Sequence, residues 1–184
     1  HHAIPDGWIW QDIANYYGAG AFPINWRENQ YDLLLRSRPR IGDSVKVVGA
    51  RPGHMKDVNF LNELKSAAKG SGDNAYIYFG TGAYPGMMLR GTIPVNENSF
   101  SISGAYPDPV TEFLNDFKNS LHNISILVDQ PRGGYRHEIA RKPHIITNIK
   151  IIATHQSPTL DSMNYYFMRR SINLYGEAFV KTMA

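Results

Sequence analysis

Three short stretches in the middle of the sequence, at 75–79, 87–93 and 100–103, place an apolar residue at about every second position. A period of two is the pattern of a strand with one buried face, and the Gly, Pro and Asn residues between the stretches favour turns. The pattern predicts an antiparallel meander, with Asn96-Glu97-Asn98 at the tip of one hairpin. These stretches therefore indicate an antiparallel sheet in the middle part of the chain.

Segments with a helical apolar period lie on both sides of these strands. The best helix start is Asp108-Pro109, because Asp accepts free backbone N–H groups and Pro fits the first helical position. Four further helices are predicted, at 8–17 before Gly18, at 29–36, at 58–69 after Asp57, and at 162–174 after Thr159 or Asp161. Gly176 is expected to separate the last of them from a short helix at 178–183.

The remaining strands are predicted at 44–48, 123–128, 135–140 and 144–154, and the apolar run 145–152 is expected to lie centrally. Strands do not alternate regularly with helices, which argues against a doubly wound parallel sheet. The pattern predicts an α+β fold with a mostly antiparallel sheet packed against helices on one face. A chain of 184 residues fits a single globular domain, which we assign to 3–184, with His1 and His2 interpreted as the remainder of a purification tag.

Composition and missing motifs narrow the chemistry. The chain has no cysteine, which excludes disulfides, thiolate zinc sites and a cysteine nucleophile. His137-Glu138 begins like a zinc-protease helix motif, but the fourth residue after His137 is Arg141, so no metal site is expected. Phosphate loops and dinucleotide fingerprints are absent from the sequence, and no cofactor is expected. No apolar run is long enough to predict a transmembrane segment, and localisation and oligomeric state are left open, with secretion as one option.

A candidate catalytic site is predicted on the strands at 135–154. If they pair as a hairpin, histidines able to pass protons lie near an arginine able to hold a phosphate. The candidate catalytic residues are Arg136, His137, Glu138, His144 and His155. This combination suits metal-independent cleavage of a phosphodiester, and the alternative is that these are polar residues on the solvated side of a sheet.

A second candidate site is a basic stretch that could follow a phosphate backbone. The candidate substrate-binding residues are Arg36, Arg38, Arg40, Arg51 and Lys56. The formal net charge of +3 is compatible with an anionic partner such as RNA, and the alternative is a solvated loop.

One resemblance bears on the cell envelope. The segments Thr81-Gly82-Ala83-Tyr84-Pro85-Gly86, Gly91-Thr92-Ile93 and Asn98-Ser99-Phe100 resemble the sheet of colicin-M-like bacteriocins, which hydrolyse a lipid-linked peptidoglycan precursor. That family's Asp-x-Tyr-Asp motif followed by His-Arg is absent, since the corresponding region reads Asp108-Pro109-Val110-Thr111-Glu112-Phe113. The resemblance therefore implies no activity.

Two functional hypotheses follow from the sequence. The first is a toxin or effector-type enzyme, a hydrolase or nuclease, that acts on a phosphate-containing substrate such as RNA or a cell-envelope precursor. The second is a non-catalytic module that binds nucleic acid or serves as a coat-like structural domain.

Overall fold

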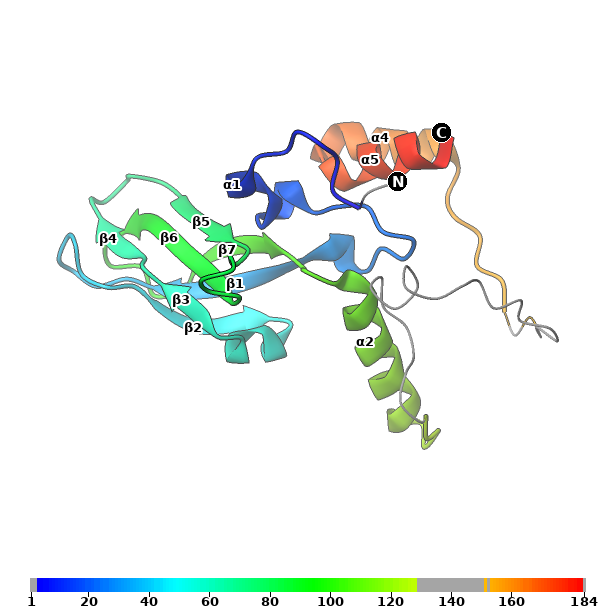
Figure 1. Ribbon diagram of the computed structural model, residues 1–184, viewed down its shortest axis with the longest axis horizontal. Helices are drawn as coiled ribbons and strands as arrows, with labels where there is room; N and C mark the ends of the chain where they lie inside the picture. The colour runs from blue at the N-terminus through cyan, green and yellow to red at the C-terminus, as the bar shows by residue number, and fades with distance from the viewer. Residues whose placement is uncertain (1–2, 129–150, 152, 184) are drawn as a thin grey trace.

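The computed structural model describes residues 3–128, 151 and 153–183, and it contains two small sheets with helices at one end (Figure 1). The first sheet is antiparallel, with the strand order β2-β1-β7. Its strands are β1 (Gln30–Arg36), β2 (Lys46–Arg51) and β7 (Phe100–Ala105). The central strand β1 pairs with both neighbours, and Leu35 opposes Val47 on one side and Phe100 on the other.

The second sheet is built around β6 (Met87–Pro94). Strand β5 (Asn74–Tyr78) pairs with it antiparallel, whereas β3 (Phe60–Asn62) and β4 (Lys65–Ala67) pair with it in parallel. Since β3 meets the first part of β6 and β4 meets the last part, these two short strands lie end to end along one edge of β6.

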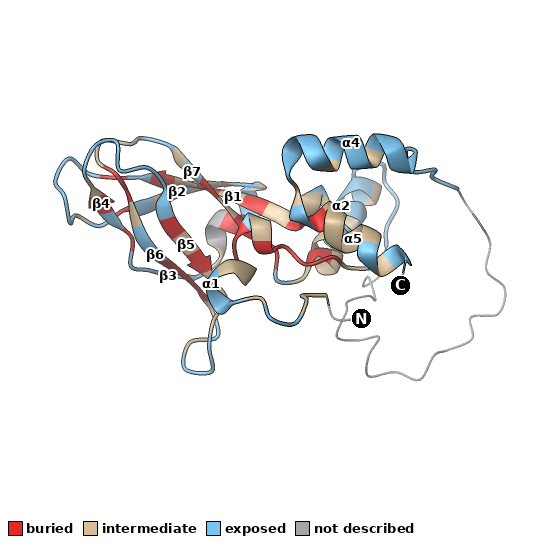
Figure 2. Ribbon diagram, turned by 90° about the horizontal axis from the view of Figure 1, so that it is seen from above, coloured by how far each residue is buried: buried red, intermediate tan, exposed pale blue. Residues whose placement is uncertain are grey.

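The core contains alternate residues of both sheets. On β1 the side chains of Tyr31, Leu33 and Leu35 are fully buried, while the residues between them are half-exposed. They belong to one cluster with Ile77 and Leu89 of the second sheet, so the two sheets share a single apolar core (Figure 2). Burial of such side chains is the main favourable term in the stability of this part of the chain.

The longer helices lie to the right of the two sheets in Figure 1. The chain begins with α1 (Trp10–Ile13) and the 3-10 turns η1 (Tyr16–Gly18) and η2 (Arg27–Asn29), and the turn η3 (Gly53–Asp57) follows β2. Helix α2 (Pro109–Asn123) projects away from the sheets, and α4 (Leu160–Arg170) packs beside α5 (Asn173–Met183).

The α+β class with antiparallel-rich sheets is confirmed, as are several individual elements. Strands β5, β6 and β7 lie where the period of two predicted them, and β2 overlaps the strand predicted at 44–48. Asp108 caps α2 as expected, because its Oδ1 accepts the backbone N–H of Thr111 at 3.1 Å. Thr159 likewise caps α4 by accepting the N–H of Ser162 at 3.3 Å.

Two predicted helices are strands in the structure. The segment 29–36 forms β1, where a period of two fits the burial better than a helical stripe does. The segment 58–69 forms β3 and β4, because its backbone pairs with β6 and the buried residues are Leu64 and Ser66 rather than one face of a helix. Tertiary pairing overrides weak helical propensity in both cases.

Other predicted elements differ in extent or partner. Only α1 and η1 form within the helix predicted at 8–17, and Asn96-Glu97-Asn98 connects strands of different sheets instead of closing a hairpin. Residues 123–128 form no strand, and Ile151 is 77% exposed outside any strand. The predicted strand 135–140 and most of the strand 144–154 lie outside the described residues.

Candidate active-site cleft

A cleft of about 400 Å³ lies where the α4–α5 pair meets the first sheet and the N-terminal turns. One wall is formed by the C-terminal end of α4 and the start of α5, and the other by η1, η2 and strands β1 and β7. The residues that line it are Tyr16, Tyr17, Glu28, Gln30, Ser103, Tyr166, Arg170, Ser171, Ile172, Asn173 and Leu174. The lining is therefore mostly polar, with three tyrosine rings and two aliphatic side chains among the polar groups.

The turn between α4 and α5 brings a hydroxyl and an amide to this cleft. Ser171 ends α4 in the left-handed conformation, with φ 54° and ψ 48°, and its N–H donates to the carbonyl oxygen of Phe167 at 2.7 Å. Glycine is the usual residue at such a position because a Cβ is strained there. A serine in this conformation strains the backbone, and strain of this kind is concentrated at functional sites.

Asn173 fixes the same turn against the opposite wall. Its Nδ2 donates to the carbonyl oxygen of Tyr17 at 2.8 Å, across 156 positions of sequence. Among the described residues nothing bonds to its Oδ1, so this oxygen is free to accept an N–H group from a ligand. The side chain is thus oriented by one bond and still able to make another.

Glu28 reaches the cleft from a left-handed turn. Arg27, Glu28 and Asn29 have φ values of 53°, 55° and 56°, and such conformations cost roughly 1–2 kcal/mol for each residue. Buried Asn29 holds the turn: its Nδ2 donates to the carbonyl oxygen of Gly20 at 2.9 Å, and its Oδ1 accepts the N–H of Trp26 at 2.9 Å. Glu28 itself accepts a hydrogen bond from Gln30 Nε2 at 2.7 Å.

Tyrosine rings and one arginine complete the cleft. The Arg170 guanidinium lies 5.9 Å from the centroid of the Tyr166 ring, which in turn lies 5.7 Å from the ring of Tyr175. Burial, followed by the nearby Asp12, raises the pKa of Tyr17 to about 12. Burial, followed by Glu28, also raises the pKa of Tyr175. These two tyrosines are therefore neutral hydrogen-bonding groups at neutral pH.

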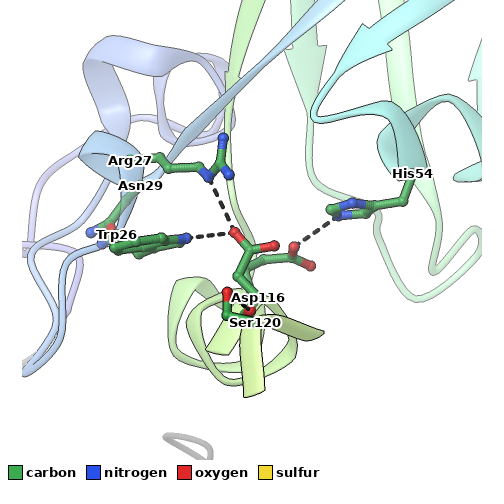
Figure 3. Close-up of polar contacts among 7 residues, drawn as sticks. Trp26, Arg27, Asn29, His54, Asp116 and Ser120 are labelled. Carbon is green, nitrogen blue, oxygen red and sulfur yellow. Dashed lines mark hydrogen bonds and ion pairs between the residues drawn. The ribbon is translucent and has the colours of Figure 1, made fainter. Parts of the chain in front are cut away.

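A second polar cluster fastens α2 to the body of the protein (Figure 3). Asp116 Oδ2 accepts hydrogen bonds from Trp26 Nε1 at 2.7 Å and from Arg27 Nε at 3.2 Å. One turn earlier on the same helix, Glu112 Oε2 lies 2.8 Å from Nε2 of His54, which belongs to η3. Asp116 Oδ2 and Glu112 Oε2 are thus both bonded to other parts of the protein, and we interpret the cluster as the attachment of α2 to the body.

Of the five predicted catalytic residues, only His155 lies in the described part of the chain, and it does not line the cleft. Arg136, His137, Glu138 and His144 lie outside the described residues. His155 is described; it is exposed in an irregular segment and is not among the residues that line the cleft.

The predicted substrate-binding residues likewise lie elsewhere. Arg36, Arg38 and Arg40 are exposed at the β1–β2 connection, and Arg51 is exposed at the end of β2. The side chain of Lys56 is not described. None of these five belongs to the residues that line the cleft.

Sequence reasoning missed Ser171 and Asn173. The pattern that could have found them is Ser-x-Asn, which occurs twice, as Ser162-Met163-Asn164 and as Ser171-Ile172-Asn173. A tripeptide with two fixed positions is too common to choose between them without the structure. The structure distinguishes them, because Ser171-Ile172-Asn173 lies in a strained turn at the cleft, whereas Ser162 and Asn164 lie at exposed positions of α4.

The described residues contain no group of three or more His, Asp or Glu side chains placed to hold a metal ion. None of the helices in the described ranges has both the length and the apolar character needed to cross a bilayer.

Comparison with known proteins identifies the family. The model of the D-Ala-D-Ala carboxypeptidase 3 (S13) family matches residues 1–184. The fold is similar to the crystal structure of penicillin binding protein 4 (dacB) from Haemophilus influenzae, with a TM-score of 0.61 and 16% sequence identity. That match covers 95% of this chain and 36% of the H. influenzae chain, so the present chain spans about a third of that protein's length. No curated protein sequence matches.

These findings correct the functional predictions made from the sequence. A toxin or effector that acts on RNA, and a nucleic-acid-binding or coat-like module, are both wrong, because the family is one of peptidases. RNA is not supported as a partner, and the resemblance to colicin-M-like bacteriocins did not identify the family. The match over the entire length of the sequence shows that the chain belongs to the D-Ala-D-Ala carboxypeptidase 3 (S13) family.

Proposed function

We propose that the protein is a serine peptidase that removes the terminal D-alanine from D-alanyl-D-alanine peptides of peptidoglycan, and that this chain supplies part of its active site. The observation that carries the proposal is the strained Ser171 turn at the cleft, in a chain that matches the family model throughout. The family name suggests D-Ala-D-Ala peptides as the substrate class, and the turn suggests Ser171 and Asn173 as active-site residues.

Penicillin-binding proteins and serine β-lactamases combine three short motifs: Ser-x-x-Lys with the nucleophile, a Ser-Asp-Asn type motif, and Lys-Thr-Gly. For the second motif the chain offers two candidates. On helix α4, Ser162 and Asn164 are two positions apart, so their side chains point in different directions. Ser162 is also engaged in the helix cap with Thr159. The turn at 171–173 places both side chains at one cleft, so we assign the motif there.

The other two motifs have no convincing copy in this sequence. Ser66-Ala67-Ala68-Lys69 matches Ser-x-x-Lys in letters, but Ser66 is buried on β4, where its Oγ accepts the N–H of Arg38 at 3.1 Å. Lys69 lies beyond the end of that strand and is exposed, whereas a nucleophile and its base must lie within hydrogen-bonding reach. Lys181-Thr182-Met183 lacks the glycine, and Lys181 Nζ donates to the carbonyl oxygens of Ala3 and Ala21.

The proposal therefore assigns the nucleophile and the Lys-Thr-Gly motif to a longer enzyme, in keeping with the 36% coverage of the penicillin-binding protein. In such an enzyme the nucleophilic serine oxygen bonds to the peptide carbonyl carbon, the C–N bond to the terminal D-alanine breaks, and water then cleaves the ester. The Ser171 hydroxyl both accepts and donates, so it can pass the nucleophile's proton to the departing amine. Asn173 Oδ1 can accept an N–H of the substrate backbone.

The test is D-alanine release from an N-acylated peptide ending in D-Ala-D-Ala, measured with the full-length protein. Ser171→Ala should lower kcat/KM by roughly 10²–10⁴-fold, which is the usual contribution of a positioned proton-transfer group. Ser171→Gly removes the hydroxyl but suits the left-handed backbone, so it should be equally inactive and at least as stable as the native protein.

The matched control is the other Ser-x-Asn copy. Ser162→Ala and Asn164→Ala, on the exposed face of α4, should change kcat/KM by less than about twofold, since neither side chain lines the cleft. The assignment would be wrong if the 162–164 variants lost activity while the folded 171–173 variants kept it. No release of D-alanine by the native full-length enzyme would overturn the proposed reaction itself.

A further inference from the structure

The end of the first sheet that lies far from the cleft carries a concentration of positive charge. Residues 37–45 connect β1 to β2 and form the loop at the left end of the long axis in Figure 1, whereas α4 and α5 lie in the right half. We call this end the basic tip. Its five cationic residues are Arg36, Arg38, Arg40, Lys46 and Lys65, and all are exposed.

Strand pairing and hydrogen bonds bring together residues from β1, β2, β4 and the connection between β1 and β2. Arg36 and Lys46 are opposite each other in the β1–β2 ladder. The N–H of Arg38 donates to Ser66 Oγ, which follows Lys65 on β4. Lys65 in turn bridges to Ser44, with its Nζ 3.2 Å from the Ser44 Oγ. Four of the five cations thus come from the segment 36–46, and the fold adds Lys65 from β4.

These charges are not neutralised within the described structure. Its ion pairs are Arg27–Asp116, His54–Glu112 and Arg90–Glu63, and none involves a residue of the basic tip. Asp43 lies half-buried in the same loop, and Glu97 is hydrogen-bonded to Ser37 through its backbone. Glu63, two residues before Lys65, is already paired with Arg90. Five exposed cations against two acidic groups leave a net positive surface, which attracts anions.

An exposed apolar side chain lies among these cations. Ile41 is 70% exposed, and it follows Arg40 directly at the turn of the loop. It is followed by Gly42, which has a φ of 88° and open space around it. Exposed side chains of this kind can insert among lipid headgroups, and long arginine side chains beside them can keep their charges at the phosphates.

We propose that the basic tip binds the surface of a bilayer that contains anionic phospholipids. Charge alone fits any polyanion, but the isoleucine favours a surface with an apolar interior over a soluble polymer. Each cation near an anionic membrane contributes to binding, and a single shallow apolar insertion adds to it. None of the five cationic residues of the basic tip lines the cleft, so binding through this end would leave the residues of the cleft uncovered.

The experiment is flotation of the complete protein with vesicles of phosphatidylcholine containing an equal amount of phosphatidylglycerol, and with vesicles of phosphatidylcholine alone. We expect binding to the anionic vesicles that weakens as salt is added, because salt screens exposed charges. The double variant Arg38→Ser/Arg40→Ser should partition about thirtyfold more weakly. Ile41→Ser, which leaves every charge in place, should weaken partitioning about tenfold.

The matched control removes the same charge from elsewhere on the molecule. Lys118→Ser/Arg169→Ser on α2 and α4 should change partitioning by less than about threefold, since these residues lie outside the basic tip. No binding to the anionic vesicles, equal binding to phosphatidylcholine alone, or no effect of Ile41→Ser would overturn the proposal. Retention by soluble polyphosphate without vesicle binding would also overturn it, in favour of a soluble polyanion.

Discussion

Asn29 shows how a single buried side chain can determine where a charged neighbour lies. It is 1% exposed, it makes hydrogen bonds to Gly20, Asn25 and Trp26, and it closes a turn of three left-handed residues. Asparagine tolerates this backbone conformation better than most residues because of its short polar side chain. The turn directs Glu28 to the cleft and Arg27 to α2, so one side chain links the two polar clusters.

Asn29→Ala should lower the free energy of unfolding by about 2–4 kcal/mol, from the lost hydrogen bonds to buried partners and the added backbone strain. Urea denaturation followed by circular dichroism measures this. Asn119→Ala, on an exposed position of α2, is the control and should change stability by less than about 0.5 kcal/mol. A loss for Asn29→Ala no larger than the control would show that the turn forms without this side chain.

At the scale of elements, α2 is held by side chains more than by broad packing. Its apolar contact with the body includes the rings of Phe113 and Trp26, whose centroids are 5.5 Å apart, while Phe117 remains 51% exposed. The bonds from Asp116 and Glu112 therefore carry much of the attachment (Figure 3). An element held in this way is expected to open locally more easily than the core of the sheets.

Asp116→Ala should release α2 without unfolding the sheets, because it leaves Trp26 Nε1 and Arg27 without their acceptor. Amide hydrogen exchange should become at least about tenfold faster along α2, corresponding to a loss of roughly 1.4 kcal/mol in local stability. Exchange within β1 and β6 should be nearly unchanged. Asn115→Ala, one residue earlier and exposed, should leave exchange in α2 as it is.

The elements that the sequence predicted well are those with strong local determinants. Asp108-Pro109 specifies the start of α2, and the period of two specifies β5 to β7. The failures at β1, β3 and β4 have one cause, since these strands are defined by pairing with distant residues such as Leu89 and Ile102. The Ser171 turn could not be predicted because nothing local separates it from the copy at 162–164.

For the whole molecule, burial of tyrosine links stability to alkaline pH. Burial, followed by the nearby Tyr106, raises the pKa of Tyr31 well above its ordinary value of 10.0. Above pH 10 the unfolded chain loses this proton and the folded chain keeps it, so stability falls as pH rises through that window. Below pH 10 both states keep the proton and the linkage vanishes.

Tyr31→Phe should remove part of this alkaline loss. The free energy of unfolding of the native protein should fall by up to about 1.4 kcal/mol per pH unit for each such tyrosine between pH 10 and 12, and the variant should fall less steeply. Urea denaturation at pH 8 to 11 measures the slopes, with Tyr165→Phe, whose ring is 63% exposed, as the control. If the free energy of unfolding fell equally steeply with pH in the native protein and in Tyr31→Phe, Tyr31 would not be a source of the alkaline loss of stability.

The bond between Asn173 and the carbonyl oxygen of Tyr17 has a consequence for how the protein is made. Its two partners are 156 positions apart, and at cellular translation rates the ribosome needs roughly 10–30 s to pass from one to the other. Both sheets have been synthesised by then and can fold, while the cleft still lacks the wall formed by α4 and α5. A growing chain therefore carries an unfinished cleft until residues 166–174 have been synthesised.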